Sequence, residues 1–290
     1  MQQVVEPHAG TGEVRVRTTF VGLNPMDWMF SSSPETAAMF GISLPARFAT
    51  DFAGVIDEIG DDSAGFAVGD RVYGSAIGRA AADHIIIDPA GADVLRRTPQ
   101  EIDDATASTL AVAGMTASAA LDAAGVGAGD TVLIGGAAGG VGIFAGQLAR
   151  LAGARVIGTA STGTFGFLEE LGVEPVAYGP GLAERIRLRA PGGITAAADL
   201  FGTEAAEVAL ALGVAPSRIS TVAAGGDAPA GVRTTGAFDA DKGALERITD
   251  AIVAGELTVP IARIFELSDV REAVALQASR RVHGKITLRM

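Results

Sequence analysis

The stretch TVLIGGAAGGVGIFAGQLARLAGARVIGTAS, residues 131–161, decides the fold. It opens with a short apolar run, residues 131–134, of the kind found in a strand buried on both faces. A glycine-rich corner follows, and the apolar residues after it recur at helical spacing up to residue 151. A second apolar run at residues 155–158 completes a strand–turn–helix–strand unit.

The glycine-rich corner has the pattern G-x-x-G-x-x-G, formed by Gly136, Gly139 and Gly142. Glycines at this place permit a tight turn, a close backbone approach to a pyrophosphate, and close packing of helix on strand. The amide groups and the positive end of the helix then bind the diphosphate. We therefore predict a dinucleotide site that includes Ala138, Gly139, Gly140, Val141 and Gly142.

The end of the second strand bears on which dinucleotide is bound. NAD-binding units usually place Asp or Glu about 20 residues past the turn, on the ribose hydroxyls. Here that position holds Thr159 to Ser161 and no acid, which favours NADPH. No Arg or Lys follows before Arg185, so NADH stays open as the alternative. Thr159 and Ser161 are the predicted hydroxyl ligands on this side.

Composition excludes several classes of function. The 290 residues carry a formal net charge of −12, which disfavours nucleic acid and anionic membranes as partners. No apolar run reaches the roughly 18 residues of a membrane span, and the absence of cysteine suits a reducing cytoplasm. The three histidines, His8, His84 and His283, form no ligand-spaced pair, so we expect no metal site.

The pattern along the chain predicts an α/β protein with two domains. Short alternating runs at residues 13–21, 51–59 and 84–88 are typical of strands in a small, partly open barrel. After Thr98 and Pro99, expected to cap a helix, the pattern becomes helical, with helices over residues 101–113 and 116–124. Six strands alternating with helices then predict a doubly wound parallel sheet, the Rossmann fold. The further strands are expected at residues 175–178, 197–201, 218–222 and 232–235.

Several short motifs resemble, in order, zinc-independent quinone oxidoreductases of the medium-chain dehydrogenase/reductase superfamily. Besides the glycine-rich corner they are Asn24-Pro25-x-Asp27-Trp28, Asp51-x-Ala53-Gly54, Gly69-Asp70-Arg71-Val72, Ala113-Gly114-x-Thr116-Ala117 and Gly284-Lys285-Ile286-Thr287-Leu288. The resemblance implies a discontinuous GroES-like catalytic domain, residues 1–97 and 257–290, around a Rossmann domain, residues 98–256. It also implies a homodimer that reduces small quinones or α,β-unsaturated carbonyl compounds by hydride transfer from NADPH.

The resemblance adds four coenzyme-binding residues. It places Thr116 beside the nicotinamide, Tyr178 beside the ribose phosphate, and Val222 and Lys285 on the coenzyme side. Tyr178 is equally well interpreted as a strand-end tyrosine, and Lys285 as an exposed strand charge.

Three residues are candidates for the proton chemistry. Asn24 offers a hydrogen bond to a substrate carbonyl or simply caps a turn. Asp27 acts as an acid only if its pKa is raised, and is otherwise a solvated turn residue. Tyr73 delivers a proton or packs the barrel, and water is the remaining proton source.

Three departures from the family pattern matter. The sequence begins close to the family's Gly-Glu-Val strand, and Ala49 stands where the family usually has glycine. Gly163 lies near the place where NADPH-dependent relatives often have a basic residue for the 2′-phosphate. The short start is native or reflects a start codon placed too late. The short start and the lack of a clear acid favour the alternative function, a non-catalytic or accessory NAD(P)H-binding protein of the same fold.

Overall fold

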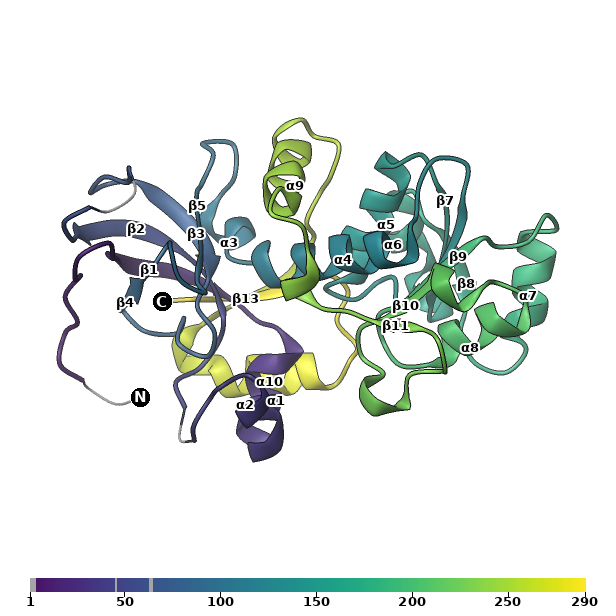
Figure 1. The fold of residues 1–290 in the computed structure, drawn as a ribbon, viewed down its shortest axis with the longest axis horizontal. Helices are drawn as coiled ribbons and strands as arrows, with labels where there is room; N and C mark the ends of the chain where they lie inside the picture. The colour runs from purple at the N-terminus through teal and green to yellow at the C-terminus, as the bar shows by residue number, and fades with distance from the viewer. Residues whose placement is uncertain (1–3, 45, 63–64) are drawn as a thin grey trace. The chain divides into compact units, whose positions relative to one another are not determined.

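The computed structural model describes residues 4–44, 46–62 and 65–290. The chain divides into two compact units, drawn in Figure 1. Unit 1 comprises residues 1–112 and 261–290, and unit 2 comprises residues 113–260. The domain bounds given by the resemblance, residues 1–97 with 257–290 and residues 98–256, stay a prediction beside these units.

Seven strands of the described residues form the sheet of unit 1, in the order β12-β13-β1-β2-β3-β5, with β4 also paired to β1. The strand β13 lies between β12, its parallel partner, and β1, its antiparallel partner, so the two ends of the chain share one sheet (Figure 1). The strands are β1 (Val14–Gly22), β2 (Asp51–Ile59), β3 (Arg71–Ser75), β4 (His84–Ile87), β5 (Val94–Arg97), β12 (Ile261–Glu266) and β13 (Lys285–Arg289).

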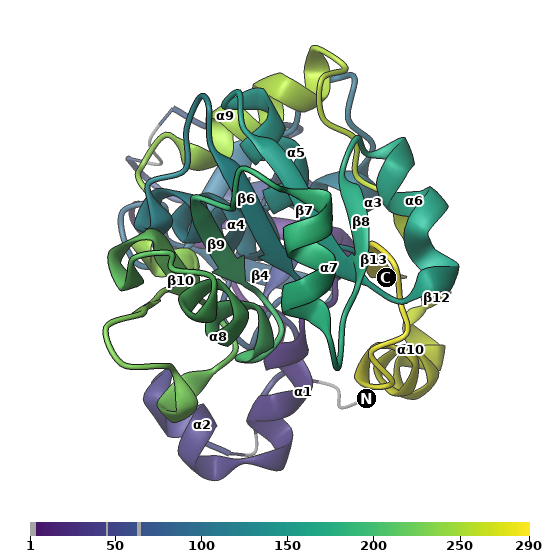
Figure 2. The same cartoon turned by 90° about the vertical axis from the view of Figure 1, so that its right-hand side faces the viewer.

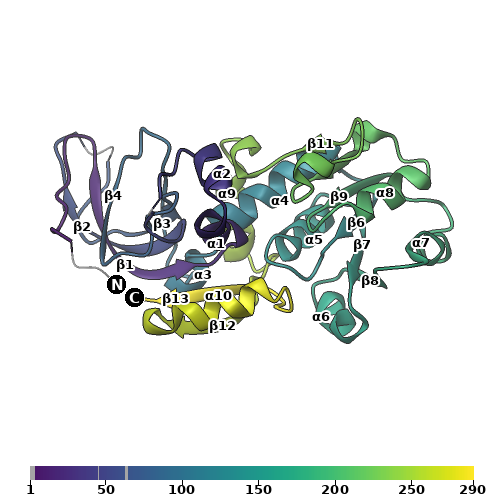
Figure 3. The same ribbon diagram turned by 90° about the horizontal axis from the view of Figure 1, so that it is seen from below.

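The alternation of the sequence accounts for these strands. In β1, Val14, Val16 and Thr18 face inward and the residues between them are more exposed, as the pleat of a half-buried strand requires. The core of unit 1 joins β1, β2 and β13 with helix α10 (Val270–Ala278), which contacts β12 and β13 (Figure 3). The strand β5 was not among the expected elements.

The helices of unit 1 correct one sequence-based expectation. The predicted helix over residues 101–113 is instead a short helix, α3 (Asp104–Ala107), followed by a turn and by α4 (Ala111–Ala124). Asp103, not Thr98, caps α3 by accepting the N–H of Thr106 at 2.8 Å. Between the two helices the buried Ser108 hydroxyl donates to the Ala105 carbonyl at 2.8 Å. The other helices are α1 (Pro25–Ser32) and α2 (Pro34–Met39).

Unit 2 is a doubly wound α/β fold, seen face on in Figure 2. Within the described residues its six strands pair in parallel in the order β11-β10-β9-β6-β7-β8. The chain runs from β6 outward to β8 and returns to β9 on the other side of β6, which creates a topological switch point. The strands are β6 (Thr131–Gly135), β7 (Arg155–Ala160), β8 (Glu174–Ala177), β9 (Ala196–Asp199), β10 (Ile219–Thr221) and β11 (Arg233–Thr234).

The helices of unit 2 cover the sheet. Helices α7 and α8 share one apolar core with β6, β7, β8 and β9, and α5 contacts β6 and β7. All expected strands of this sheet are present within a residue or two of their predicted positions. The helices are α5 (Gly142–Leu151), α6 (Phe165–Glu170), α7 (Leu182–Arg189), α8 (Glu204–Ala211) and α9 (Ala244–Val253).

The buried position of β13 yields a first prediction. Leu288→Ala removes a fully buried side chain from the middle of the sheet and should lower the free energy of unfolding by about 2–5 kcal/mol. The control is Leu188→Ala, since Leu188 is 74% exposed on α7. Urea unfolding followed by circular dichroism measures both variants, and equal stability of the two would contradict the core position of β13.

Candidate functional site

The glycine corner of unit 2 joins β6 to α5. Gly136 has φ = +71°, in the left-handed region that favours glycine. A Cβ atom on residue 142 would overlap the carbonyl oxygens of Gly136 and Ala137, so only glycine lets α5 begin so close to the turn. The two glycines therefore fix the direction in which the helix leaves the sheet.

Backbone N–H groups of this corner are left available. Within the described chain, the N–H groups of Ala138, Gly140 and Val141 donate no hydrogen bond to another residue. They stand at the N-terminus of α5, where the helix dipole favours negative charge. A Cβ atom on Gly139 would meet only the Gly136 oxygen, at 3.3 Å, and otherwise open space. The corner therefore fits a dinucleotide diphosphate.

Thr159 shapes this corner. Its side chain is buried, and its Oγ1 accepts the N–H of Gly136 at 3.0 Å, while its carbonyl accepts the N–H of Ala137. Thr159 thus fixes the turn from the neighbouring strand β7. Ser161 directly follows β7 and is exposed. Its hydroxyl shares a hydrogen bond of 2.7 Å with the hydroxyl of Thr164.

The other predicted coenzyme residues of unit 2 lie on different elements. Val222 follows β10, and its N–H donates to the carbonyl of Asp199 at the end of β9. Tyr178 follows β8 and is 58% exposed, whereas Thr116 is buried on α4. The carboxyl ends of parallel strands lie at one edge of the sheet. The predicted coenzyme residues of unit 2 therefore lie at that edge, except Thr116.

In unit 1 a buried polar network joins three segments far apart in the sequence. Lys285 Nζ donates to Asn24 Oδ1 at 2.7 Å and to the Leu23 carbonyl at 3.2 Å. Asn24 Nδ2 donates to Asp51 Oδ2 at 2.8 Å, and Asp51 Oδ1 accepts the N–H of Val112 at 3.1 Å. The Asn24 amide is therefore held from both sides, with its oxygen toward the ammonium.

Asp27 extends this network from the first turn of α1. Its Oδ2 accepts the N–H of Asn24 at 2.7 Å, and its Oδ1 accepts the hydroxyl of Thr50 at 2.9 Å. Asp27 and Lys285 are 2% and 3% exposed, so two interpretations are wrong, namely a solvated turn aspartate and an exposed strand lysine. Neither burial could be predicted from the neighbouring residues, because the partners come from segments far away in the sequence.

Burial dominates the electrostatics of the network. It raises the pKa of Asp27 to about 7 and that of Asp51 to about 6, although hydrogen bonds and the Lys285 charge oppose both shifts. Burial also lowers the pKa of Lys285, against the attraction of the two carboxylates. Asp27 thus retains a proton at pH values where an ordinary carboxyl is ionised.

Tyr73, the third candidate for proton chemistry, lies in β3. Its side chain is 1% exposed, in the register position opposite Ala53 of β2 and Arg96 of β5. The ring therefore packs in the interior of unit 1. A role of Tyr73 in proton transfer stays a prediction.

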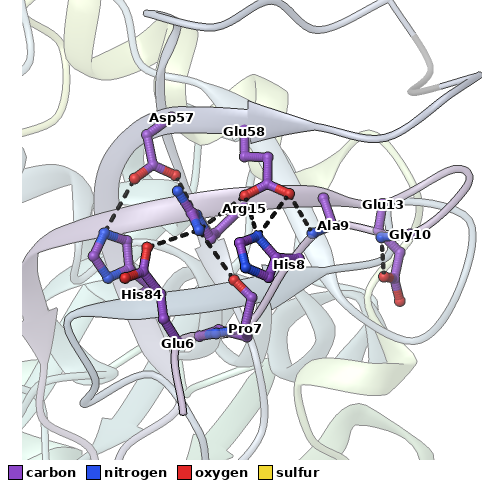
Figure 4. A network of polar contacts seen from close by, with 10 residues as sticks. All are labelled: Glu6, Pro7, His8, Ala9, Gly10, Glu13, Arg15, Asp57, Glu58 and His84. Atoms are coloured by element: carbon purple, nitrogen blue, oxygen red, sulfur yellow. Dashed lines mark hydrogen bonds and ion pairs between the residues drawn. The ribbon is translucent and has the colours of Figure 1, made fainter.

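Two histidines belong to a polar network on β1 and β2 (Figure 4). His8 Nδ1 lies 3.0 Å from Glu58, and His84 Nε2 lies 3.1 Å from Asp57. Arg15 lies between the two carboxylates and pairs with both at 2.8 Å. No described group of three or more His, Asp or Glu side chains is arranged to hold a metal ion.

Family models match both units. The model of the alcohol dehydrogenase GroES-like domain matches residues 10–92, and that of the zinc-binding dehydrogenase matches residues 173–288. These matches and the fold confirm the predicted fold class, a GroES-like domain together with a Rossmann domain.

Curated relatives resemble parts of the chain. Erythronolide synthase EryA2 of Saccharopolyspora erythraea is 39% identical over 177 residues, 59% of this chain and 4% of that protein. The chloroplast envelope quinone oxidoreductase homolog of Arabidopsis thaliana is 34% identical over 186 residues, 60% of this chain and 54% of that protein. The chain thus spans about half the length of the quinone oxidoreductase homolog and a small part of the synthase.

Solved structures match nearly the whole chain. The quinone oxidoreductase from Coxiella burnetii has a TM-score of 0.84 at 27% identity and covers 99% of this chain and 93% of its own. The enoyl reductase CurK (TM-score 0.86, 24% identity) and a mycobacterial protein complexed with NADPH (0.84, 23%) each cover 100% of this chain and 94% of their own; at these identities they show the fold alone. The chain is thus similar in sequence and fold to quinone oxidoreductases of the medium-chain dehydrogenase/reductase type.

The buried network predicts an unusual pH dependence of stability. Since the folded protein holds the Asp27 proton up to about pH 7 and the unfolded chain releases it near 3.8, the free energy of unfolding falls as pH rises between these values. Asp27→Asn, which mimics the protonated acid, should reduce this slope by on the order of 1 kcal/mol per pH unit. Urea unfolding from pH 5 to 8 measures it.

The control for that variant is Asp61→Asn, because Asp61 is an exposed carboxyl of the same unit. It should keep the slope of the unsubstituted protein. An unchanged slope in Asp27→Asn would show that Asp27 is ionised throughout this range.

Proposed function

We propose that the chain is an NADPH-dependent reductase of small quinones or α,β-unsaturated carbonyl compounds. The observation that carries this proposal is the corner at the N-terminus of α5. There, three N–H groups without partners among the described residues, those of Ala138, Gly140 and Val141, fit a coenzyme diphosphate. The names of the similar proteins, quinone oxidoreductase and enoyl reductase, support the acceptor class.

The protein's own part is to bind and orient both reactants. The corner amides hold the diphosphate, and Thr159 holds the corner. When bound, the coenzyme supplies the hydride that adds to an electron-poor double bond or quinone. Lack of an acid at the end of β7, where Ser161 presents a hydroxyl, supports NADPH, with NADH as the second coenzyme.

The three candidates for the proton chemistry are buried in unit 1. The exposed fractions of their side chains are 3% for Asn24, 2% for Asp27 and 1% for Tyr73. Direct contact of any of them with substrate is a prediction. Lys285 fixes the Asn24 amide, and its contact with coenzyme is likewise a prediction. We propose water as the proton source for the reduced acceptor.

Three further properties belong to the proposal. Catalysis is metal-free, because the sequence has no cysteine and two of its three histidines pair with carboxylates. The protein acts in the cytoplasm as a homodimer joined through edge strands of the nucleotide domain. None of the described helices combines the length and apolar character needed to cross a bilayer. Light scattering tests the dimer.

The decisive experiment combines coenzyme binding with turnover. Calorimetry with NADPH and NADH measures binding, and loss of absorbance of NADPH with a panel of quinones and enones measures reduction. Binding followed by turnover is the expected result. Tight binding with no turnover on any acceptor favours the alternative, a non-catalytic or accessory coenzyme-binding protein, and no binding of either coenzyme contradicts both.

A substitution in the corner tests where the coenzyme binds. Gly139→Ala places a methyl group on the open side of the turn and should weaken NADPH binding roughly tenfold, a loss of about 1.4 kcal/mol. Gly192→Ala is the matched control, because its added methyl also meets open space but stands in a distant loop. Similar NADPH affinity in the two variants, with both folded by circular dichroism, would remove the diphosphate from this corner.

A further inference from the structure

A groove lies between the C-terminal ends of two helices of unit 2, α5 and α9. Its lining residues come from residues 148–152 on one side and residues 247–256 on the other. The volume of this α5–α9 groove is about 490 Å³, within the range of about 300–1,000 Å³ that is usual for small-molecule sites. The glycine corner stands at the opposite end of α5, so the groove is a separate site.

Hydrogen bonds fix the two sides of the groove relative to each other. The buried Gln147 of α5 donates its Nε2 to the Thr258 carbonyl at 2.8 Å, and its Oε1 accepts the Thr258 N–H at 2.9 Å. Because Thr258 follows α9, this pair of bonds holds the end of the groove segment against α5. A groove that is already formed costs less free energy of ordering when a ligand binds.

The floor of the groove is apolar. All the lining residues from the α5 side are apolar, and Ala251 and Ala254 continue this surface on the α9 side. The side chain of Leu151 is 44% exposed there. The floor can therefore cover a hydrocarbon group, which is the first requirement on a ligand. The three residues from the α5 side are Leu148, Leu151 and Ala152.

The charges of the groove set the second requirement. The exposed carboxylates of Asp250 and Glu256 have no ion pair or hydrogen bond within the described part of the chain. Arg247, the one cation of the lining, donates to Asp241 at 3.0 Å, so its charge is already matched. The C-terminal ends of α5 and α9 add partial negative charge. The groove therefore attracts cations and repels anions.

We propose that the α5–α9 groove binds an amphiphilic organic cation, an alkylammonium ion whose ammonium group pairs with Asp250 and Glu256 and whose hydrocarbon chain lies on the apolar floor. A metal ion would use only the carboxylates, and a fatty acid would use only the floor. A stable protein interface needs about 800 Å² from each partner, so a groove of this size favours a small molecule. The proposal does not depend on coenzyme binding.

The test compares three probes on the full chain. Titration followed by the amide signals of the isotope-labelled protein in nuclear magnetic resonance gives both the affinity and the place of binding. The probes are octylammonium, ethylammonium, which has the charge without the chain, and octanoate, which has the chain with the opposite charge. We expect octylammonium to shift the signals of Leu151 and Ala254 to saturation, and the other two to bind at least about tenfold more weakly.

Two pairs of variants test the two parts of the groove. Asp250→Asn combined with Glu256→Gln should weaken octylammonium binding roughly tenfold. Its matched control is Glu169→Gln combined with Glu170→Gln, which changes the net charge equally through exposed carboxylates of α6. Leu151→Ala should weaken the binding roughly threefold, whereas Leu188→Ala, on the exposed side of α7, should leave it unchanged.

The outcomes decide the proposal. Octylammonium that shifts no groove signals, or octanoate that binds as tightly, would overturn it. It would also be overturned if the two double variants, both folded by circular dichroism, had equal affinity, because the attraction would then come from the overall negative charge of the chain. Full affinity in Leu151→Ala would overturn the part assigned to the apolar floor.

Discussion

The close approach of α5 to the turn that precedes it is the constraint on which unit 2 depends. Residue 142 must lack a side chain because the carbonyl oxygens of Gly136 and Ala137 occupy that space. The turn can then leave the N–H groups of Ala138, Gly140 and Val141 directed away from the protein's own acceptors. Unsatisfied donors at a helix N-terminus are costly to bury. The feature that makes the corner a binding site is therefore also one that a ligand would stabilise.

A different constraint organises unit 1. Two buried carboxyl groups, of Asp27 and Asp51, are linked through Asn24 to one buried amine, that of Lys285. In this network the carboxyl groups therefore outnumber the amine. Burial disfavours the charged form of each carboxyl group, which is why the pKa of Asp27 is raised to about 7. The same residues attach the start of α1 to β2 and β13, so polar contacts join these segments in addition to the apolar core.

The sequence was most informative where the physics is local. The spacing of Gly136, Gly139 and Gly142 between a strand and a helix predicted the corner, and alternation predicted the longer strands. Ala49 is a further local case, because its φ of +64° explains the glycine usual in the family. The short strand β5 and the division of α3 from α4 were missed, since propensity does not register a buried hydroxyl such as that of Ser108.

The site residues divide in the same way. The partner that Asp27 bonds outside its own turn, Thr50, is 23 residues away, so the pattern around Asp27 resembles an ordinary turn.

The position of β13 also has a consequence for biosynthesis. A ribosome delivers the strands in order, and β1 must wait for β13, the last of the described strands, to cover Phe20 to Gly22. Unit 2, encoded as one uninterrupted segment, has all its strands available earlier. During translation β1 therefore keeps an open strand edge until β13 has been made, while unit 2 is already able to fold, and an open edge favours aggregation.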